Sequence, residues 1–129
     1  MNNKIEYVEY ITRDYLRDNP DKIFLFGDNL KRFGYKGQAK EMRGEPNSIG
    51  IVTKKYPSNS DESFIYDRDF KYIKEVIDKD FASIPDNVTV IIPLNGLGTG
   101  LARLDITSPL LFQYIKDKIE ELKINKLND

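Results

Sequence analysis

Two glycine-rich segments are the places in this sequence where the backbone itself could do chemistry. Residues 95–100 read NGLGTG and residues 27–37 read GDNLKRFGYKG, and each segment follows a run of apolar, β-forming residues. Glycine adopts positive φ and lets a ligand approach the main chain without a Cβ in the way. Successive N–H groups in such a turn form a concave anion site, and a phosphate or diphosphate is its natural occupant. A tight turn without any ligand is the alternative for the later segment, which is neither a dinucleotide fingerprint nor a Walker loop.

Polar and aromatic residues near these segments have both a binding and a structural interpretation. Asp28 and Asn29 close the first apolar run, where they either face a ligand or satisfy their own backbone in an Asx turn. Phe33 and Tyr35 flank a glycine and either pack or stack on a nucleotide base. Lys54 follows another apolar run, where it is either solvated or attracts a diphosphate.

The composition removes several classes of function. The 129 residues include no Cys and no His, which excludes zinc sites of the usual kind, thiol nucleophiles and histidine-based acid–base catalysis. We therefore expect no metal and no resident cofactor. The formal net charge of -1 argues against nucleic acid as a partner. No segment has the length and apolarity of a membrane span or a signal core, so we expect a cytoplasmic protein without a membrane partner.

Hydrophobic patterns predict strands and helices in alternation, and therefore one α/β domain over residues 1–129. The predicted strands cover residues 5–8, 22–26, 47–53 and 88–94, and the predicted helices cover residues 12–19, 37–43, 66–80 and 107–123. Thr12 is the expected cap of the first helix, although a single helix over residues 5–18 also fits the spacing. In a largely parallel or mixed sheet, ligands bind at the carboxyl ends of the strands, which is where both glycine segments fall.

Three segments together resemble the macrodomain, the α/β module that binds ADP-ribose. Residues 91–105 (IIPLNGLGTGLARLD) are similar to the loop that wraps the diphosphate and the distal ribose. Residues 47–55 (NSIGIVTKK) are similar to the strand that ends in Thr-Lys-Lys in the glycohydrolases that remove terminal ADP-ribose from proteins. Residues 26–43 are similar to the strand, turn and helix that contact ribose and phosphates. The chain is also similar to small macrodomain-like proteins of phage and bacteria, and a phage origin would place it in the host cytoplasm.

The resemblance implies a three-layer sandwich with a mixed, largely parallel central sheet, and a cleft for ADP-ribose or a related NAD-derived nucleotide. An ADP-ribosylated macromolecule is a further partner that it implies. The predicted ligand-binding residues are Gly27, Asp28, Asn29, Phe33, Gly34, Tyr35, Gly37, Gln38, Thr53, Asn95, Gly96, Leu97, Gly98, Thr99, Gly100 and Leu101. Lys54 occupies the position of the catalytic lysine of the glycohydrolases.

The sequence departs from the glycohydrolases at one position that matters for catalysis. The aspartate that acts as acid and base in that branch is replaced by Ala102, which has no proton to transfer. Asp28 is the other carboxylate that could assist Lys54, from a different loop. We therefore favour a binding protein over an enzyme. Two alternatives stay open: an ADP-ribosyl hydrolase that uses Lys54 with another carboxylate, and a protein that sequesters a nucleotide immune signal.

Overall fold

A sheet of parallel strands forms the centre of the molecule. The computed structural model describes residues 2–123, so the predicted domain of residues 1–129 extends beyond them at both ends. Within the described residues the strands are β1 (Lys4–Val8), β2 (Ile23–Asn29), β3 (Ser48–Lys54) and β4 (Thr89–Pro93), in the spatial order β1-β4-β2-β3. All three strand pairings are parallel, so the expectation of a largely parallel sheet is confirmed and the expectation of a mixed one is wrong. Each connection between consecutive strands contains a helix that returns the chain to the same end of the sheet, which makes the next strand parallel.

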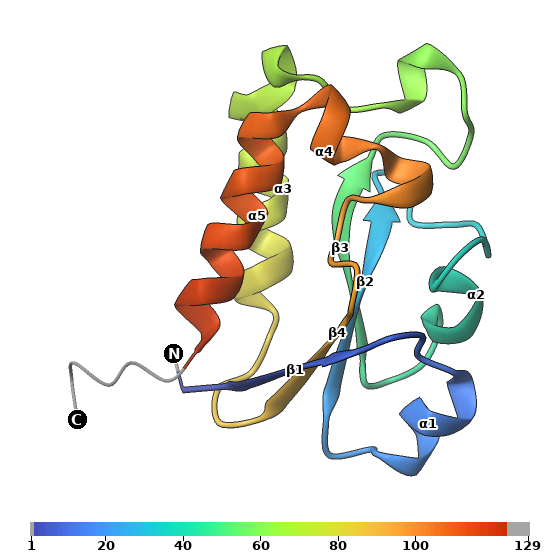
Figure 1. The fold of residues 1–129 in the computed structure, drawn as a ribbon, viewed down its shortest axis with the longest axis vertical. Coiled ribbons are helices and arrows are strands. Elements are labelled where there is room, and N and C mark those ends of the chain that lie inside the picture. The colour runs from blue at the N-terminus through green and yellow to red at the C-terminus, as the bar shows by residue number, and fades with distance from the viewer. Residues whose placement is uncertain (1, 124–129) are drawn as a thin grey trace.

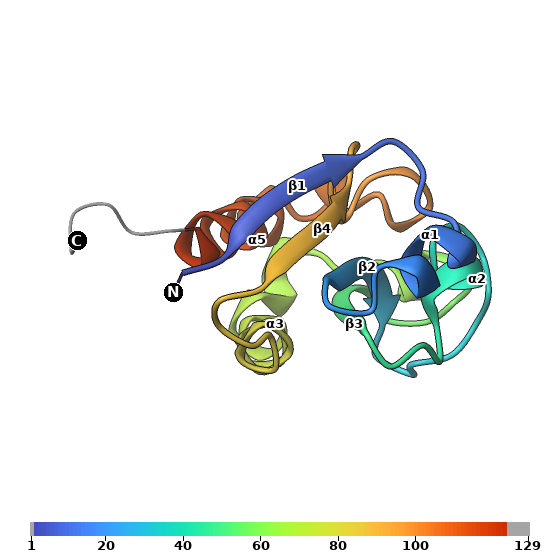
Figure 2. The same cartoon turned by 90° about the horizontal axis from the view of Figure 1, so that it is seen from below.

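Helices cover both faces of this sheet. They are α1 (Arg13–Asp18), α2 (Ala39–Met42), α3 (Phe70–Ala82), α4 (Leu104–Thr107) and α5 (Pro109–Leu122), with short 3-10 turns at Asp61–Ser63, Asp67–Asp69 and Gly100–Ala102. Figure 1 shows the sheet between α3 and α5 on one side and α1 and α2 on the other. Figure 2, seen from below, shows α3 and α5 toward the left and α1 and α2 toward the right, with β1 passing across α5. Every helix within the described residues is too short or too polar to cross a membrane.

The alternation of side chains along the strands creates one apolar core on each face. Phe24, Phe26 and Ile91 pack with Leu16 and Met42 of the helices α1 and α2. The larger core lies on the opposite face, against α3 and α5. Its buried members from the sheet and these two helices include Leu25, Ile51, Val90, Ile92, Ile73, Ile77, Phe81, Leu111, Ile115 and Ile119. The described residues therefore form one small α/β domain, as the hydrophobic pattern predicts.

The ends of several elements differ from their predicted positions. The single helix over residues 5–18 is wrong, because residues 4–8 pair with β4 and the Thr12 side chain caps a separate helix by accepting a hydrogen bond from the Tyr15 amide (3.1 Å). The helix predicted at 37–43 has only four residues, Ala39–Met42. The strand predicted at 22–26 continues to Asn29, because Gly27 and Asp28 still pair with Ile51 and Val52 of β3.

Candidate functional site

Two adjoining hollows lie at the carboxyl ends of β2, β3 and β4. The first, of about 300 Å³, is bounded by the ends of β2 and β3 and by the loop that follows β2. The second, of about 360 Å³, is bounded by the end of β4 and the glycine loop behind it. The residues that line both hollows are Gly27, Lys36, Thr53, Leu101 and Ala102. These shared residues join the hollows into one cleft across the sheet edge.

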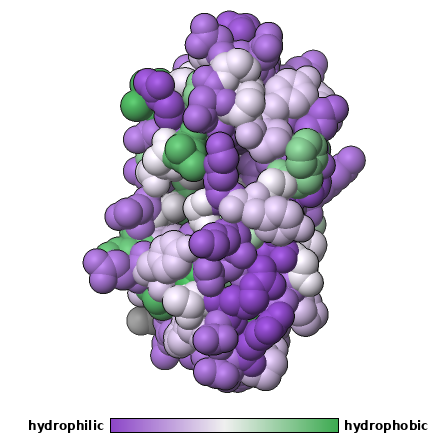
Figure 3. Space-filling view, turned by 90° about the vertical axis from the view of Figure 1, so that its right-hand side faces the viewer, coloured by the Kyte–Doolittle hydropathy of each residue, from purple (hydrophilic) through white to green (hydrophobic). Residues whose placement is uncertain are grey.

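The cleft opens on a largely hydrophilic surface. Figure 3 shows the side of the molecule that carries α1 and α2, where hydrophobic residues appear only as small separate areas. Phe33 and Tyr35 are 57% and 65% exposed, respectively, at the first hollow, so they are not packed into the core. An exposed aromatic side chain beside a hollow is available for stacking on a planar ligand.

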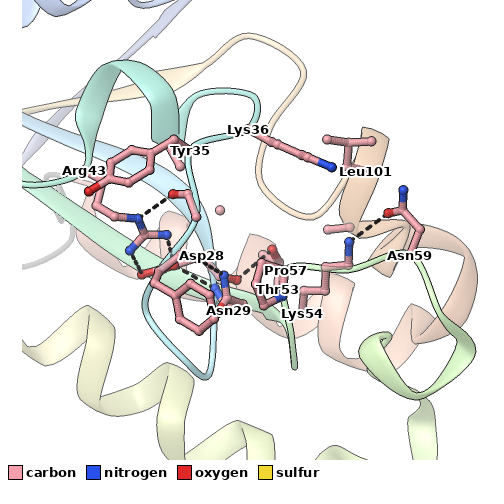
Figure 4. A pocket seen from close by; sticks show the side chains of 15 residues that line it. Asp28, Asn29, Tyr35, Lys36, Arg43, Thr53, Lys54, Pro57, Asn59 and Leu101 are labelled. Atoms are coloured by element: carbon pink, nitrogen blue, oxygen red, sulfur yellow. Dashed lines mark hydrogen bonds and ion pairs between the residues drawn. The ribbon is translucent and has the colours of Figure 1, made fainter.

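Asp28, at the end of β2, is buried but fully engaged by neighbouring groups. The Arg43 guanidinium donates to both of its carboxylate oxygens, at 2.6 Å and 3.3 Å, and also to the carbonyl oxygen of Gly34 at 2.8 Å. The Asn29 amide donates to the same carboxylate at 2.8 Å, and Arg32 approaches it at 3.5 Å. Figure 4 shows Arg43 and Asp28 pointing toward one another at one end of the first hollow. This bidentate pair fixes the loop after β2 to the sheet.

A glycine on the neighbouring strand makes room for that carboxylate. A Cβ at Gly50 would lie 2.5 Å from an oxygen of Asp28 and 2.8 Å from its Cβ. Arg32 connects the same cluster to helix α3, because its guanidinium donates to Asp80 at 2.7 Å. Asp28 thus serves as an internal anchor of the site, and its charge is neutralised within the protein.

Lys54, at the end of β3, differs from Asp28 because its charge is not neutralised by a neighbouring group of opposite charge within the described residues. It is only 9% exposed, yet within the described residues it forms no ion pair with a carboxylate. Its ammonium donates to the Asn59 side-chain oxygen at 3.2 Å and lies 5.2 Å from the centre of the Phe64 ring. Burial lowers the pKa of Lys54 below the usual lysine value, and the positive charge of Lys36 lowers this pKa further. A cation that lines an open hollow attracts anions to it.

The glycine loop after β4 lines the second hollow with main chain. Gly96, Gly98 and Gly100 have φ values of +84°, +91° and +64°, a region that glycine enters without steric cost. The carbonyl of Gly98 accepts the Leu104 amide at 2.8 Å, which locks the loop. In the part of the chain that the structure describes, the amides of Leu97, Gly98 and Thr99 donate to no protein acceptor. The same three residues line the second hollow.

Every predicted ligand-binding residue lines at least one of the two hollows. Besides Asp28, three of them use the side chain to hold the loops in place. The Gln38 amide bonds both the N–H and the carbonyl of Ile11 at 2.8 Å. Asn29 bonds the backbone of the loop that it begins, and the Thr99 hydroxyl donates to the Asn95 carbonyl at 3.2 Å. Thr99 thus uses its hydroxyl within the loop rather than toward the cleft.

Sequence reasoning did not select several residues that line the cleft. They are Lys36, Ala39, Arg43, Pro57 and Asn59 in the first hollow and Glu9, Tyr10 and Pro93 in the second. Lys36 had a local signal, since it lies between the two glycines of the loop. Arg43 had none, because its contact with Asp28 spans 15 residues of chain.

Few carboxylate side chains line the cleft. Ala102 lines both hollows and shares the first with Lys54, so the substituted position is at the site and carries no carboxylate. Asp105, the next carboxylate along the chain, lines neither hollow. The carboxylates that do line them are Asp28, which is engaged by Arg43, and Glu9 at the second hollow. No cluster of three or more potential metal ligands occurs among residues 2–123. The arrangement is suited to holding an anion and lacks a ready proton donor beside Lys54.

Comparison with known proteins gives a family without an assigned activity. Residues 6–118 match a family that is described as "Family of unknown function (DUF7831)". No significant match to a curated protein or to a solved structure was found. The matched segment contains β2, β3, β4, the last residues of β1 and both hollows. Because the match covers most of the sequence, the chain belongs to the family of unknown function DUF7831.

Proposed function

We propose that this protein binds ADP-ribose or a related NAD-derived nucleotide in the cleft at the carboxyl edge of its sheet, and that its fold is macrodomain-like. The observation that carries the proposal is the buried side chain of Lys54, which lines the first hollow and whose ammonium has no carboxylate partner within the described residues. A buried charge is costly unless it is paired. A bound diphosphate supplies the missing negative charge.

The two hollows differ in a way that suits the two ends of such a nucleotide. The first hollow is bordered by Phe33, Tyr35 and Pro57, which offer apolar and aromatic surface for a base. The second is lined by the glycine loop, and the loop amides that donate to no acceptor within residues 2–123 suit phosphate oxygens and ribose hydroxyls. Each volume lies within or near the range of ordinary small-molecule sites. The partner is thus free ADP-ribose, a related nucleotide, or the ADP-ribosyl group of a modified macromolecule.

Hydrolysis of an ADP-ribosyl linkage is the second candidate, and the lowered pKa of Lys54 favours it. An amine with a lowered pKa is a better nucleophile at neutral pH. The reaction also needs a proton donor for the leaving group. Ala102 cannot supply the proton, and Asp28 is held by Arg43. Binding without turnover is therefore the stronger proposal.

Isothermal titration calorimetry with ADP-ribose tests the proposal. We expect one bound ligand per chain for the wild type and a loss of about a hundredfold in affinity for Lys54→Met, the size expected for a charged hydrogen bond. Lys71→Met is the matched control, because Lys71 is exposed on α3 and lines neither hollow. Absence of binding by the wild type at millimolar ADP-ribose would refute the proposal. Release of ADP-ribose from a modified peptide, lost in Lys54→Met, would establish the hydrolase instead.

A further inference from the structure

Lys36 lies where the two hollows of the cleft meet. It belongs to the loop after β2, between Gly34 and Gly37, and it lines both hollows. Figure 4 shows its side chain extending across the mouth of the first hollow toward Leu101. The side chain is exposed, and within the described residues it forms no hydrogen bond or ion pair. Its position is therefore set by the loop and not by a partner.

Lys36 and Lys54 place two positive charges at the same cleft from different elements. Lys54 comes from the end of β3 and Lys36 from the loop after β2. The two ammonium groups are close enough for Lys36 to lower the pKa of Lys54. Neither has a carboxylate partner among the described residues, since the carboxylate nearest the first hollow, Asp28, is paired with Arg43. In the ligand-free cleft the two lysines repel each other, and an anion between them would convert this repulsion into attraction.

We propose that Lys36 is a specificity-determining residue that makes the cleft select nucleotides whose negative charge lies in the middle of the molecule, between two uncharged ends. The inference rests on the proposed function and names the class of ligand: a nucleoside diphosphate joined to a second sugar or nucleoside. One uncharged end occupies the first hollow and the other occupies the second. The diphosphate then lies at the junction, beneath Lys36 and beside Lys54.

This arrangement assigns different tasks to the two lysines. Lys54 is buried and fixed, so it holds the anion from below. Lys36 is exposed and on a loop, so it reaches the anion only after the ligand has entered. An uncharged fragment such as adenosine gains nothing from Lys36, because it has no charge at the junction.

Calorimetric titration of ADP-ribose and of adenosine into the wild type, Lys36→Met, Lys36→Arg and Lys40→Met tests the inference. Lys40 is exposed on α2 nearby and lines neither hollow, so Lys40→Met controls for the loss of one positive charge. We expect Lys36→Met to weaken ADP-ribose binding roughly tenfold, which is about 1.4 kcal/mol. It should also flatten the salt dependence of that binding. Lys36→Arg should stay close to the wild type, and Lys40→Met and adenosine binding should be unaffected.

The possible failures are distinguishable. If the wild type binds ADP-ribose and Lys36→Met binds it equally well, the role of Lys36 is refuted while the proposed function stands. If Lys36→Met weakens adenosine as much as ADP-ribose, Lys36 acts through the shape of the loop and the inference is equally refuted. If the wild type binds no ADP-ribose, both proposals fall.

Discussion

Two neighbouring strands end in buried charges that the protein treats in opposite ways. Asp28, at the end of β2, is enclosed by Arg43, Arg32 and the amide of Asn29. Lys54, at the end of β3, has one neutral acceptor, Asn59, and no carboxylate partner within residues 2–123. Both side chains line the same hollow. We propose that the first charge builds the site and that the second is kept for a ligand.

The largest expected effect comes from removing the partner of the enclosed charge. Arg43→Met leaves Asp28 buried with only Arg32 at 3.5 Å as a cation, and breaking a buried pair in this way costs about 3 kcal/mol of folding free energy. Urea denaturation measures the loss. Arg17→Met is the matched control, because the Arg17 side chain is 61% exposed in its pair with Glu45. Equal losses for the two variants would show that the Asp28–Arg43 pair has no special role.

A substitution at Gly50 tests whether the space that this glycine leaves for the Asp28 carboxylate matters for stability. Gly50→Ala puts a Cβ within 2.5 Å of an Asp28 oxygen, so the carboxylate must move away from Arg43. Overpacking of this kind costs about 2 kcal/mol. The same substitution in an Asp28→Gly background should be nearly neutral, because the carboxylate and the Cβ with which it collides are both gone. A cost that persists in that background would place the strain elsewhere on β3.

Removing the Lys54 charge should raise stability, whereas removing the partner of Asp28 should lower it. Lys54→Met removes a buried ammonium without a counter-charge, so we expect a melting temperature a few degrees above that of the wild type, together with the loss of ligand binding. The pKa of Lys54 is lower in the folded protein than its ordinary value of 10.5, so the protonated form weakens folding. This penalty is complete below the lowered pKa and disappears as the pH rises toward 10.5. The advantage of Lys54→Met should therefore shrink through that interval in thermal unfolding at increasing pH, and a variant that is less stable than wild type at neutral pH would contradict the comparison.

The smallest effect is expected at Asn59, the acceptor of the Lys54 ammonium. Asn59 is exposed, so Asn59→Ala should change the free energy of unfolding by no more than about 0.5 kcal/mol. Urea denaturation beside the Arg43 variant gives the direct contrast. A loss comparable with that of Arg43→Met would mean that Asn59 neutralises Lys54 as Arg43 neutralises Asp28, and the two strand ends would then be alike.

Most of the scaffold was predictable because it follows from local patterns. The strands predicted at 22–26 and 88–94 overlap β2 and β4, and the Thr12 hydroxyl caps α1 as expected. The parallel direction of every strand pair could not be read from these runs, since it depends on how each crossover returns. Nor could the end of β2, which continues to Asn29 only because β3 offers partners beyond Gly27.

The candidate site divides in the same way. The residues predicted from glycine spacing and from the resemblance all line one cleft, because loops at the carboxyl ends of parallel strands share an edge of the sheet. The state of each charge was not predictable. Asp28 is neutralised because Arg43 reaches it from the end of α2. Such long-range pairing has no signature in the local sequence.

A crystal structure determined after soaking with ADP-ribose tests the central claim most directly. We predict electron density for the nucleotide across both hollows, with a diphosphate oxygen about 3 Å from the Lys54 ammonium, the distance of a charged hydrogen bond. The Asp28–Arg43 pair should be unchanged in the same crystal. A cleft that stays empty at saturating ADP-ribose, or a nucleotide bound with its diphosphate away from Lys54, would contradict the account.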